Sequence, residues 1–285
     1  MKLTIGFSPC PNDTFIFDAL VNKKINTGNI EFELVLEDVQ TLNEMAIAQK
    51  LDITKISYGS LPLILENYAV LSSGSALGNG VGPLLIAPRE VVPPDVKRHT
   101  IAIPGEHTTA HVLFSLAYPD ATNKVFLRYN EIEDFVLNNN DNLGVIIHEN
   151  RFTYRDKGLF KITDLGNFWE QETGLPIPLG GIVARRNLPQ QVISKVQSLI
   201  RESLEYSYAH DGELSEFVKT NSQEMSEEVM RKHIDLYVNK FSIDLGEDGK
   251  GAIKKFLSVY CATNKIPVDL NRIFLAEKGP ESLFV

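Results

Sequence analysis

Cysteine is scarce in this chain, which has only Cys10 and Cys261 among its 285 residues. This scarcity excludes the disulfide-rich class of small secreted domains, and the distance between the two thiols in the sequence gives no reason to pair them. The chain also lacks an apolar run near the roughly 20 residues of a membrane-spanning helix. Its first residues enter a strand without the charged and apolar regions of a signal peptide. We therefore expect a cytoplasmic protein with no membrane partner.

Positive charge is also in deficit, with 28 basic against 37 acidic residues and a formal net charge of -9. Such a balance repels phosphate backbones and anionic lipid surfaces, so a nucleic-acid partner is not expected. Hydrophobic residues make up 43% of the chain. That content and the length suit a protein with a good core and two lobes rather than one.

Strand-like runs alternate with segments of helical periodicity along the chain, which predicts an α/β fold. Two strands punctuated by proline or glycine, at 83–87 and 176–184, are interpreted as crossings between two lobes. We expect residues 1–98 together with 185–285 to form a first, discontinuous lobe, and residues 99–184 to form a second lobe inserted into it. A small ligand would bind in the cleft between them.

Polar residues fall at three predicted strand-to-helix turns, around Asn12, Ser57 and Thr108. After the first strand, Asn12 or Asp13 is the candidate N-cap of a helix that begins near Thr14. At the third turn, a threonine hydroxyl and unpaired backbone amides at a helix N-terminus attract a carboxylate or another anion. The three turns together predict a site for a small anionic molecule, with Asn12 and Thr108 among its binding residues.

His148 follows the buried strand at 144–147 and is the main candidate for chemistry. The carboxyl ends of strands form the rim of the ligand crevice in open α/β sheets, although a histidine there can also simply bond a backbone carbonyl. Cys10, at another strand end, has no local base and is interpreted as a packed thiol. His107 and His111 have the spacing of a metal pair but lack a third ligand, so no metal or cofactor is predicted.

Six motifs along the chain together resemble the 1,4-dihydroxy-6-naphthoate synthase family of the futalosine route to menaquinone. They are SPCPNDTF at 8–15, KISY at 55–58, GVGPL at 80–84, PGEHTTA at 104–110, IIHE at 146–149 and RFTY at 151–154. The resemblance implies a type II periplasmic-binding-protein fold without a cofactor. It also implies a carbon–carbon lyase that converts cyclic dehypoxanthinyl futalosine to 1,4-dihydroxy-6-naphthoate.

By the same resemblance, His148 falls on the catalytic histidine, interpreted as a general base. Positions 55–57 and 109–110 fall on substrate contacts, namely Lys55, Ile56, Ser57, Thr109 and Ala110. The implied partner is a small-molecule carboxylate, and the protein is expected to be a monomer or a homodimer.

Two other functions stay open at this point. Chorismate dehydratase has a similar fold in the same pathway but performs a different elimination. A non-catalytic protein that binds a small carboxylate is the alternative from another class, since a fold alone does not fix an activity.

Overall fold

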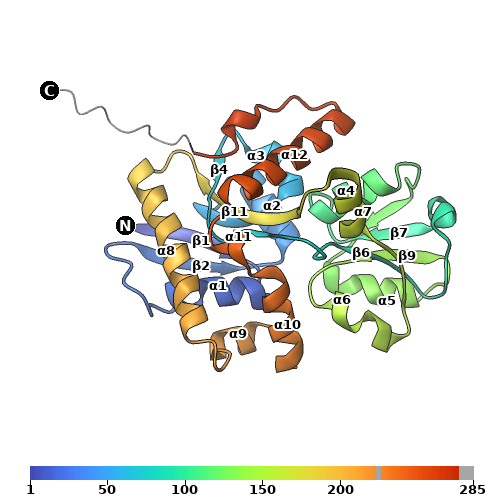
Figure 1. The fold of residues 1–285 in the computed structure, drawn as a ribbon, viewed down its shortest axis with the longest axis horizontal. Helices are drawn as coiled ribbons and strands as arrows, with labels where there is room; N and C mark the ends of the chain where they lie inside the picture. Colours follow the sequence, from blue (N-terminus) through green and yellow to red (C-terminus); the bar gives the residue numbers. More distant parts are fainter. Residues whose placement is uncertain (223–225, 276–285) are drawn as a thin grey trace.

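The structure, a computed structural model, describes residues 1–222 and 226–275. Its strands form two separate sheets, which lie side by side in Figure 1. We call the six-stranded sheet and the helices that cover it the first lobe. The five-stranded sheet and its helices, drawn mostly in green, are the second lobe. The predicted two-lobed α/β fold is therefore confirmed.

The sheet of the first lobe runs in the order β2-β1-β3-β11-β4, and β5 also pairs with β11. The first three strands in this order are parallel, whereas β11 runs antiparallel to β3. Apolar side chains of β1 and β3, such as Ile5 and Ile53, are completely buried. The strands are β1 (Lys2–Phe7), β2 (Glu31–Leu36), β3 (Ile53–Ser57), β4 (Tyr68–Val70), β5 (Ala76–Gly78) and β11 (Ile177–Arg185).

The sheet of the second lobe runs in the order β10-β6-β9-β7-β8. Its centre, β9, pairs in parallel with β7 and antiparallel with β6. Gly144 in β9 lies under helix α5, where an added Cβ would come within 2.5 Å of Ile132. The strands are β6 (Leu84–Ala87), β7 (Thr100–Ile103), β8 (Lys124–Phe126), β9 (Asn142–Ile146) and β10 (Phe160–Asp164).

Helices connect and cover the strands in both lobes. The α-helices are α1 (Pro11–Val21), α2 (Val39–Ile47), α3 (Leu61–Ile64), α4 (Thr109–Ala117), α5 (Ile132–Leu137), α6 (Asn150–Thr153), α7 (Leu165–Thr173), α8 (Gln190–Ala209), α9 (Glu216–Asn221), α10 (Glu227–Tyr237), α11 (Lys240–Ile243) and α12 (Gly246–Asn264). Short 3-10 turns are η1 (Tyr58–Ser60), η2 (Pro93–Arg98), η3 (Tyr129–Glu131), η4 (Tyr154–Lys157) and η5 (Leu270–Arg272).

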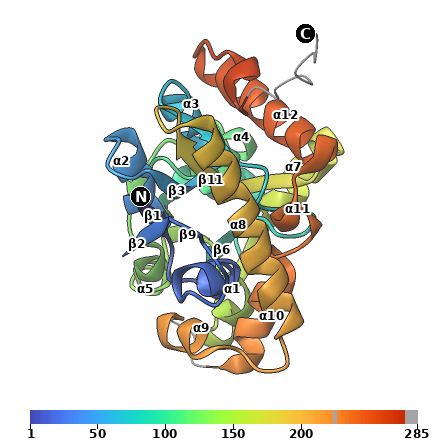
Figure 2. The ribbon, with the colours of Figure 1, turned by 90° about the vertical axis from the view of Figure 1, so that its left-hand side faces the viewer.

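The C-terminal helices pack on the first lobe, as Figures 1 and 2 show for α8 beside α1. A buried serine ties these two helices together, because Ser203 Oγ donates to Ile16 O at 2.7 Å and accepts from Leu20 N at 3.0 Å. Met230 and Ile234 of α10 belong to the same apolar cluster. This arrangement places α10 next to the start of α1, and therefore next to the cleft.

The first helix begins earlier than the sequence predicted. Its N-cap is Cys10, without a side-chain cap bond, and α1 starts at Pro11. Neither Asn12 nor Asp13 caps the helix. Proline is favoured in the first helical turn because its missing N–H has no intrahelical partner there, so the Pro11 ring lets the helix start ahead of the polar residues. As a result, Asn12 and Asp13 lie on the first turn and are free for other contacts.

The two crossing segments differ from the predicted lobe boundaries at 98/99 and 184/185. Strand β6, expected with the first lobe, pairs with β9 and β10 of the second sheet. Strand β11, expected with the second lobe, pairs with β3, β4 and β5 of the first. A short apolar run indicates a buried strand but does not tell which sheet it joins, so these assignments could not be read from the sequence.

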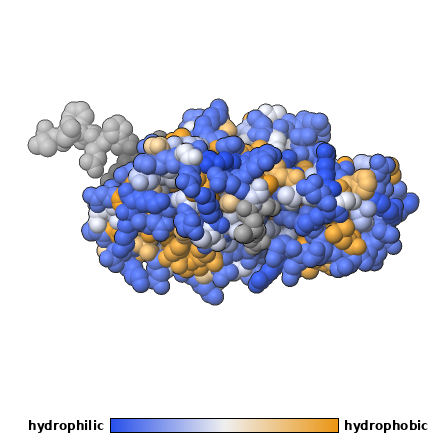
Figure 3. All heavy atoms as spheres, turned by 90° about the horizontal axis from the view of Figure 1, so that it is seen from below, coloured by the Kyte–Doolittle hydropathy of each residue, from blue (hydrophilic) through white to orange (hydrophobic). Residues whose placement is uncertain are grey.

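Hydrophilic residues cover most of the face seen in Figure 3, with small apolar areas between them. The large apolar side chains that are exposed, such as Leu63, Val92 and Phe160, come from separate elements. Among the residues that the structure describes, no helix is long and apolar enough to cross a membrane.

Candidate active site

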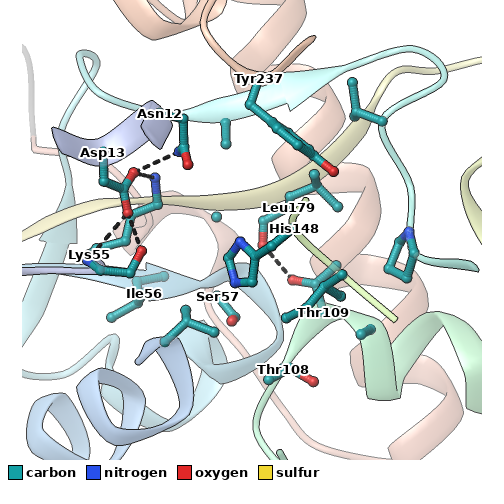
Figure 4. A pocket seen from close by; sticks show the side chains of 18 of the residues that line it. Asn12, Asp13, Lys55, Ile56, Ser57, Thr108, Thr109, His148, Leu179 and Tyr237 are labelled. Atoms are coloured by element: carbon teal, nitrogen blue, oxygen red, sulfur yellow. Dashed lines mark hydrogen bonds and ion pairs between the residues drawn. The ribbon is translucent and has the colours of Figure 1, made fainter. Parts of the chain in front are cut away.

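One cavity between the lobes brings together all the site residues that the sequence predicted (Figure 4). They come from the starts of α1 and α4, from β3 and from the segment after β9. The predicted residues that line it are Asn12, Lys55, Ile56, Ser57, Thr108, Thr109, Ala110 and His148. Distant parts of the chain therefore converge on one place, while the roles of these residues in binding and chemistry stay predictions.

Asp13 organises the first-lobe wall of the cavity. Its carboxylate accepts hydrogen bonds from Lys55 Nζ at 2.7 Å, Asn12 Nδ2 at 2.8 Å and Ser8 Oγ at 2.5 Å. Only 1% of the Asp13 side chain and 6% of the Lys55 side chain are exposed. The charge of Lys55 is thus balanced within the protein, and the position of Asn12 is fixed before any ligand enters. Asp13 was not among the predicted site residues, although it stands in the SPCPNDTF motif.

Ser57, at the end of β3, is held by Asn43 of helix α2. The Ser57 amide donates to Asn43 Oδ1 at 2.8 Å, and Asn43 Nδ2 donates to Ser57 Oγ at 3.2 Å. Asn43 Nδ2 also lies 3.3 Å from His107 O in the second lobe. This buried amide therefore links the end of β3 to the turn before α4, a role that its place in an amphipathic helix did not indicate.

The N-terminus of α4 meets the cavity as predicted. Thr108 is the N-cap, and its Oγ1 accepts from the His111 amide at 3.3 Å. The Thr109 hydroxyl donates to Leu179 O at 2.6 Å and accepts from Gly59 N at 3.1 Å. Because the first amides of a helix have no intrahelical acceptor, those of Thr109 and Ala110 are the groups left to bind an anion.

Gly59 allows this close contact between the lobes. A Cβ added there would lie 2.6 Å from Thr108 O and 2.9 Å from Thr109 N, which no ordinary side chain tolerates. The absence of a side chain at Gly59 thus lets η1 approach the backbone at the start of α4. No local pattern indicates this contact, because the two segments are far apart in the chain.

His148 lies two residues beyond the end of β9, in the left-handed region of the backbone with φ of 58°. Its Nδ1 is 3.5 Å from Cys10 Sγ, and its Nε2 is buried without a hydrogen-bond partner among the described residues. The ring of Tyr129 packs edge-on against it, with ring centroids 4.8 Å apart. In Figure 4 the imidazole points into the space between Lys55 and Thr109.

Burial sets the protonation of this group. It lowers the pKa of His148 to about 4, because the charged imidazolium loses its hydration. The carboxylates of Asp13 and Asp38 oppose this shift, and the nearby Lys55 adds to it. Burial also raises the pKa of the Cys10 thiol, and the carboxylates of Glu149 and Asp13 add to that effect. At neutral pH the pair is therefore an uncharged imidazole beside an uncharged thiol. This agrees with the interpretation of Cys10 as a packed thiol rather than a nucleophile.

His233 of helix α10 was not among the residues that the sequence predicted for the site. His233 lines the same cavity, and its ring lies 6.2 Å from that of His148. Tyr237, one helical turn later on α10, lines the cavity as well. No local pattern marks these residues, because only the packing of α10 beside the start of α1 brings them to the site.

One group of potential metal ligands occurs in the described part of the chain. The ligand atoms of Cys10, His148 and Glu149 all lie within 4.8 Å of one another. By contrast, both ring nitrogens of His111 are already engaged, one with Glu106 O at 2.8 Å and the other 3.2 Å from Lys124 Nζ. The spacing of His107 and His111 therefore reflects the first turn of α4 rather than an open pair of ligands.

Comparison with known proteins decides the family. Residues 3–262 match a family described as menaquinone biosynthesis. The chain belongs to this menaquinone biosynthesis family. It is 44% identical over 283 residues to a 1,4-dihydroxy-6-naphtoate synthase of Thermus thermophilus, with 99% of each chain covered. It is 40% identical over 270 residues to the enzyme of that name from Streptomyces coelicolor, with 93% of this chain and 95% of that one covered.

Solved structures agree on the fold of this menaquinone biosynthesis protein. A Candida albicans protein described as having the generic periplasmic-binding-protein fold superposes with a TM-score of 0.67 at 14% identity, covering 98% of this chain and 99% of its own. The predicted periplasmic-binding-protein-like fold is thus confirmed, and the naming of the relatives makes the chain an enzyme of menaquinone biosynthesis.

Proposed function

We propose that the protein is a lyase that converts cyclic dehypoxanthinyl futalosine to 1,4-dihydroxy-6-naphthoate, with His148 as the general base. The observation that carries this proposal is the arrangement of His148 in the cavity. A neutral imidazole with an unpartnered Nε2 shares that cavity with the start of α4, where the amides of Thr109 and Ala110 have no intrahelical acceptor. The first can take a proton and the second can hold a carboxylate.

The base must carry its own proton on Nδ1, so that the Nε2 lone pair is available. In that tautomer Nδ1–H donates to Cys10 Sγ, which is 3.5 Å away and accepts weakly. Because the pKa of His148 is lowered to about 4, the imidazole is uncharged at neutral pH. Its conjugate acid is then strong enough to return the proton later in the reaction.

The proposed chemistry begins when Nε2 removes the proton of a substrate hydroxyl. The electron pair left on oxygen forms a carbonyl, the adjacent carbon–carbon bond breaks, and its electrons enter the ring that becomes the aromatic naphthoate. The imidazolium then returns a proton, and the carbonyl fragment leaves. Aromatisation supplies much of the driving force, so the protein mainly orients the substrate and moves protons.

The amides of Thr109 and Ala110 are the proposed partners of the substrate carboxylate. The positive end of the α4 dipole stabilises such a group without a cationic side chain. No cation on the first-lobe wall is needed for this role, because the charge of Lys55 is already balanced by Asp13 at 2.7 Å. The carboxylate would be fixed at α4 while the reacting hydroxyl lies next to His148.

The test is to incubate the purified protein separately with cyclic dehypoxanthinyl futalosine and with chorismate, and to follow the product by absorbance and mass spectrometry. Formation of 1,4-dihydroxy-6-naphthoate from the first substrate alone supports the proposal. Consumption of chorismate would instead support a dehydratase. Tight binding of the naphthoate without turnover of either substrate would support a binding protein.

A further inference from the structure

His233 has an unusual combination of complete burial and unused hydrogen-bonding capacity. Its side chain is 0% exposed, and neither Nδ1 nor Nε2 has a hydrogen-bond partner among the described residues. Leaving a polar group buried and unpaired costs about 1–3 kcal/mol, so such groups need an explanation. The ring lies between two others, with centroids 6.2 Å from His148 and 4.6 Å from Tyr237. It lines the cavity in which the proposed reaction takes place.

The charge of this imidazole is set by its surroundings. Burial lowers the pKa of His233 well below its ordinary value, and the nearby His148 and Lys55 lower it further. Glu149 faces the ring from the second lobe, with its Oε2 3.9 Å from His233 Nε2. His233 is therefore a neutral imidazole at pH 7, with one nitrogen that donates and one that accepts.

The position of Glu149 selects between the two tautomers. A carboxylate only accepts hydrogen bonds, so the nitrogen that faces it, Nε2, is the one that carries the proton. The separation exceeds hydrogen-bond length by about 1 Å, which a small closing motion of the lobes can remove. Nδ1 is then left as the acceptor. His233 and Glu149 belong to different lobes, so their contact depends on the closed cleft.

We infer that His233 is a second imidazole that touches the substrate, with Nδ1 accepting a hydrogen bond from a substrate hydroxyl while Glu149 holds Nε2–H. This inference rests on the proposed function for the identity of the ligand. His148 comes from the second lobe and His233 from the first, so a polyhydroxylated substrate can bond to both lobes at once. His233 would then contribute to affinity and position, whereas His148 would remove the proton.

The experiment compares His233→Phe with His233→Asn. Phenylalanine keeps an aromatic ring of similar size but has no acceptor, whereas the asparagine amide oxygen can take the place of Nδ1. We expect His233→Phe to raise KM and to weaken binding of 1,4-dihydroxy-6-naphthoate by about 5- to 100-fold, the worth of one buried hydrogen bond. We expect kcat to change much less, and His233→Asn to recover most of the loss.

A ligand without hydroxyls provides the matched control. Binding of 2-naphthoate, measured by calorimetry, should differ by less than about twofold between wild type and His233→Phe, since a ligand without the hydroxyl makes no such bond. An equal loss for both ligands, or normal KM and product affinity in a folded His233→Phe, would overturn the inference. If His233→Phe does not fold, His233→Gln is compared with His233→Asn instead. The glutamine amide lies near the position of Nε2 rather than that of Nδ1, so it cannot replace the acceptor. A loss in His233→Gln that His233→Asn lacks supports the inference, and equal behaviour overturns it.

The proposed function and the role of His233 can be tested separately. If the wild type forms no naphthoate from cyclic dehypoxanthinyl futalosine, the proposed function fails and this inference fails with it. If the wild type is active and the variants match it in KM and in product affinity, only the role of His233 is overturned.

Discussion

Two walls of the cavity differ in how completely their polar groups are satisfied. On one side, Asp13 accepts hydrogen bonds from Lys55, Asn12 and Ser8. On the other, His148 Nε2 and both ring nitrogens of His233 have no partner among the described residues. A satisfied network fixes a shape, whereas an unsatisfied group is available to a ligand. We therefore assign the Asp13 wall to positioning and the histidine wall to contact with the reacting part of the substrate.

The largest effect on stability is expected when the ion pair between Lys55 and Asp13 is removed from the Asp13 wall. Lys55→Met leaves the Asp13 carboxylate buried without its cation, which should lower the free energy of unfolding by about 3–5 kcal/mol. Chemical denaturation measures this change. Lys232→Met, which removes the exposed pair with Glu228 at 2.6 Å, is the control and should change stability by less than about 1 kcal/mol. Equal losses in the two variants would mean that the Asp13 wall is not the fixed side of the cavity.

A smaller loss of stability is expected when the Thr109 hydroxyl, which links the two lobes, is removed. Thr109→Val removes a hydroxyl that donates to Leu179 O and accepts from Gly59 N, so it should lower stability by about 1–3 kcal/mol. Thr263→Val, at an exposed hydroxyl bonded to Val259 O, should cost much less. Thermal and denaturant unfolding of both variants check this. Weaker product binding in Thr109→Val without any loss of stability would instead show that the hydroxyl serves the ligand.

On the histidine side of the cavity, removing an unsatisfied hydroxyl should have the opposite effect on stability. The Tyr129 hydroxyl is buried without a partner in the described part of the chain, next to His148. Tyr129→Phe should therefore leave stability unchanged or raise it by up to about 1 kcal/mol. In Tyr68→Phe, by contrast, the lost hydroxyl donates to Leu51 O at 2.6 Å, and stability should fall. A clear loss in Tyr129→Phe, found in the same unfolding experiments, would show that the hydroxyl has a partner after all.

Local patterns predicted the two-lobed fold and the turns at Asn12, Ser57 and Thr108. The family resemblance implied the substrate contacts at positions 55–57 and 109–110, and all of these residues line one cavity. A strand end followed by small polar residues indicates the edge of the sheet that faces the ligand cleft. Thr108 caps α4, as its position in the sequence suggested. The strand pattern also indicated His148, which follows β9, and the family resemblance implied its role as the general base. Local information was therefore enough to find the turns that face the cleft.

What the sequence did not reveal depends on tertiary contacts. His233 stands on an amphipathic helix with no motif of its own, and Asn43 is one polar residue of another helix. The contact between Cys10 and His148 has no local signal either, because the two residues are 138 positions apart in the chain. The sheets joined by β6 and β11 were misplaced for the same reason, since an apolar run specifies burial but not its neighbours.

The most direct test of the account is the rate of naphthoate formation in a single turnover, measured for wild type and His148→Asn between pH 4 and 9. Asparagine keeps a polar group of similar size but cannot act as a base near neutrality. We expect the wild-type rate to stay level at neutral pH and to fall only toward pH 4, where the buried imidazole, with its pKa of about 4, becomes protonated. His148→Asn should fold, bind product and react about 10² to 10⁴ times more slowly. A folded variant whose rate stays within about tenfold of wild type would contradict the role of His148 as the base.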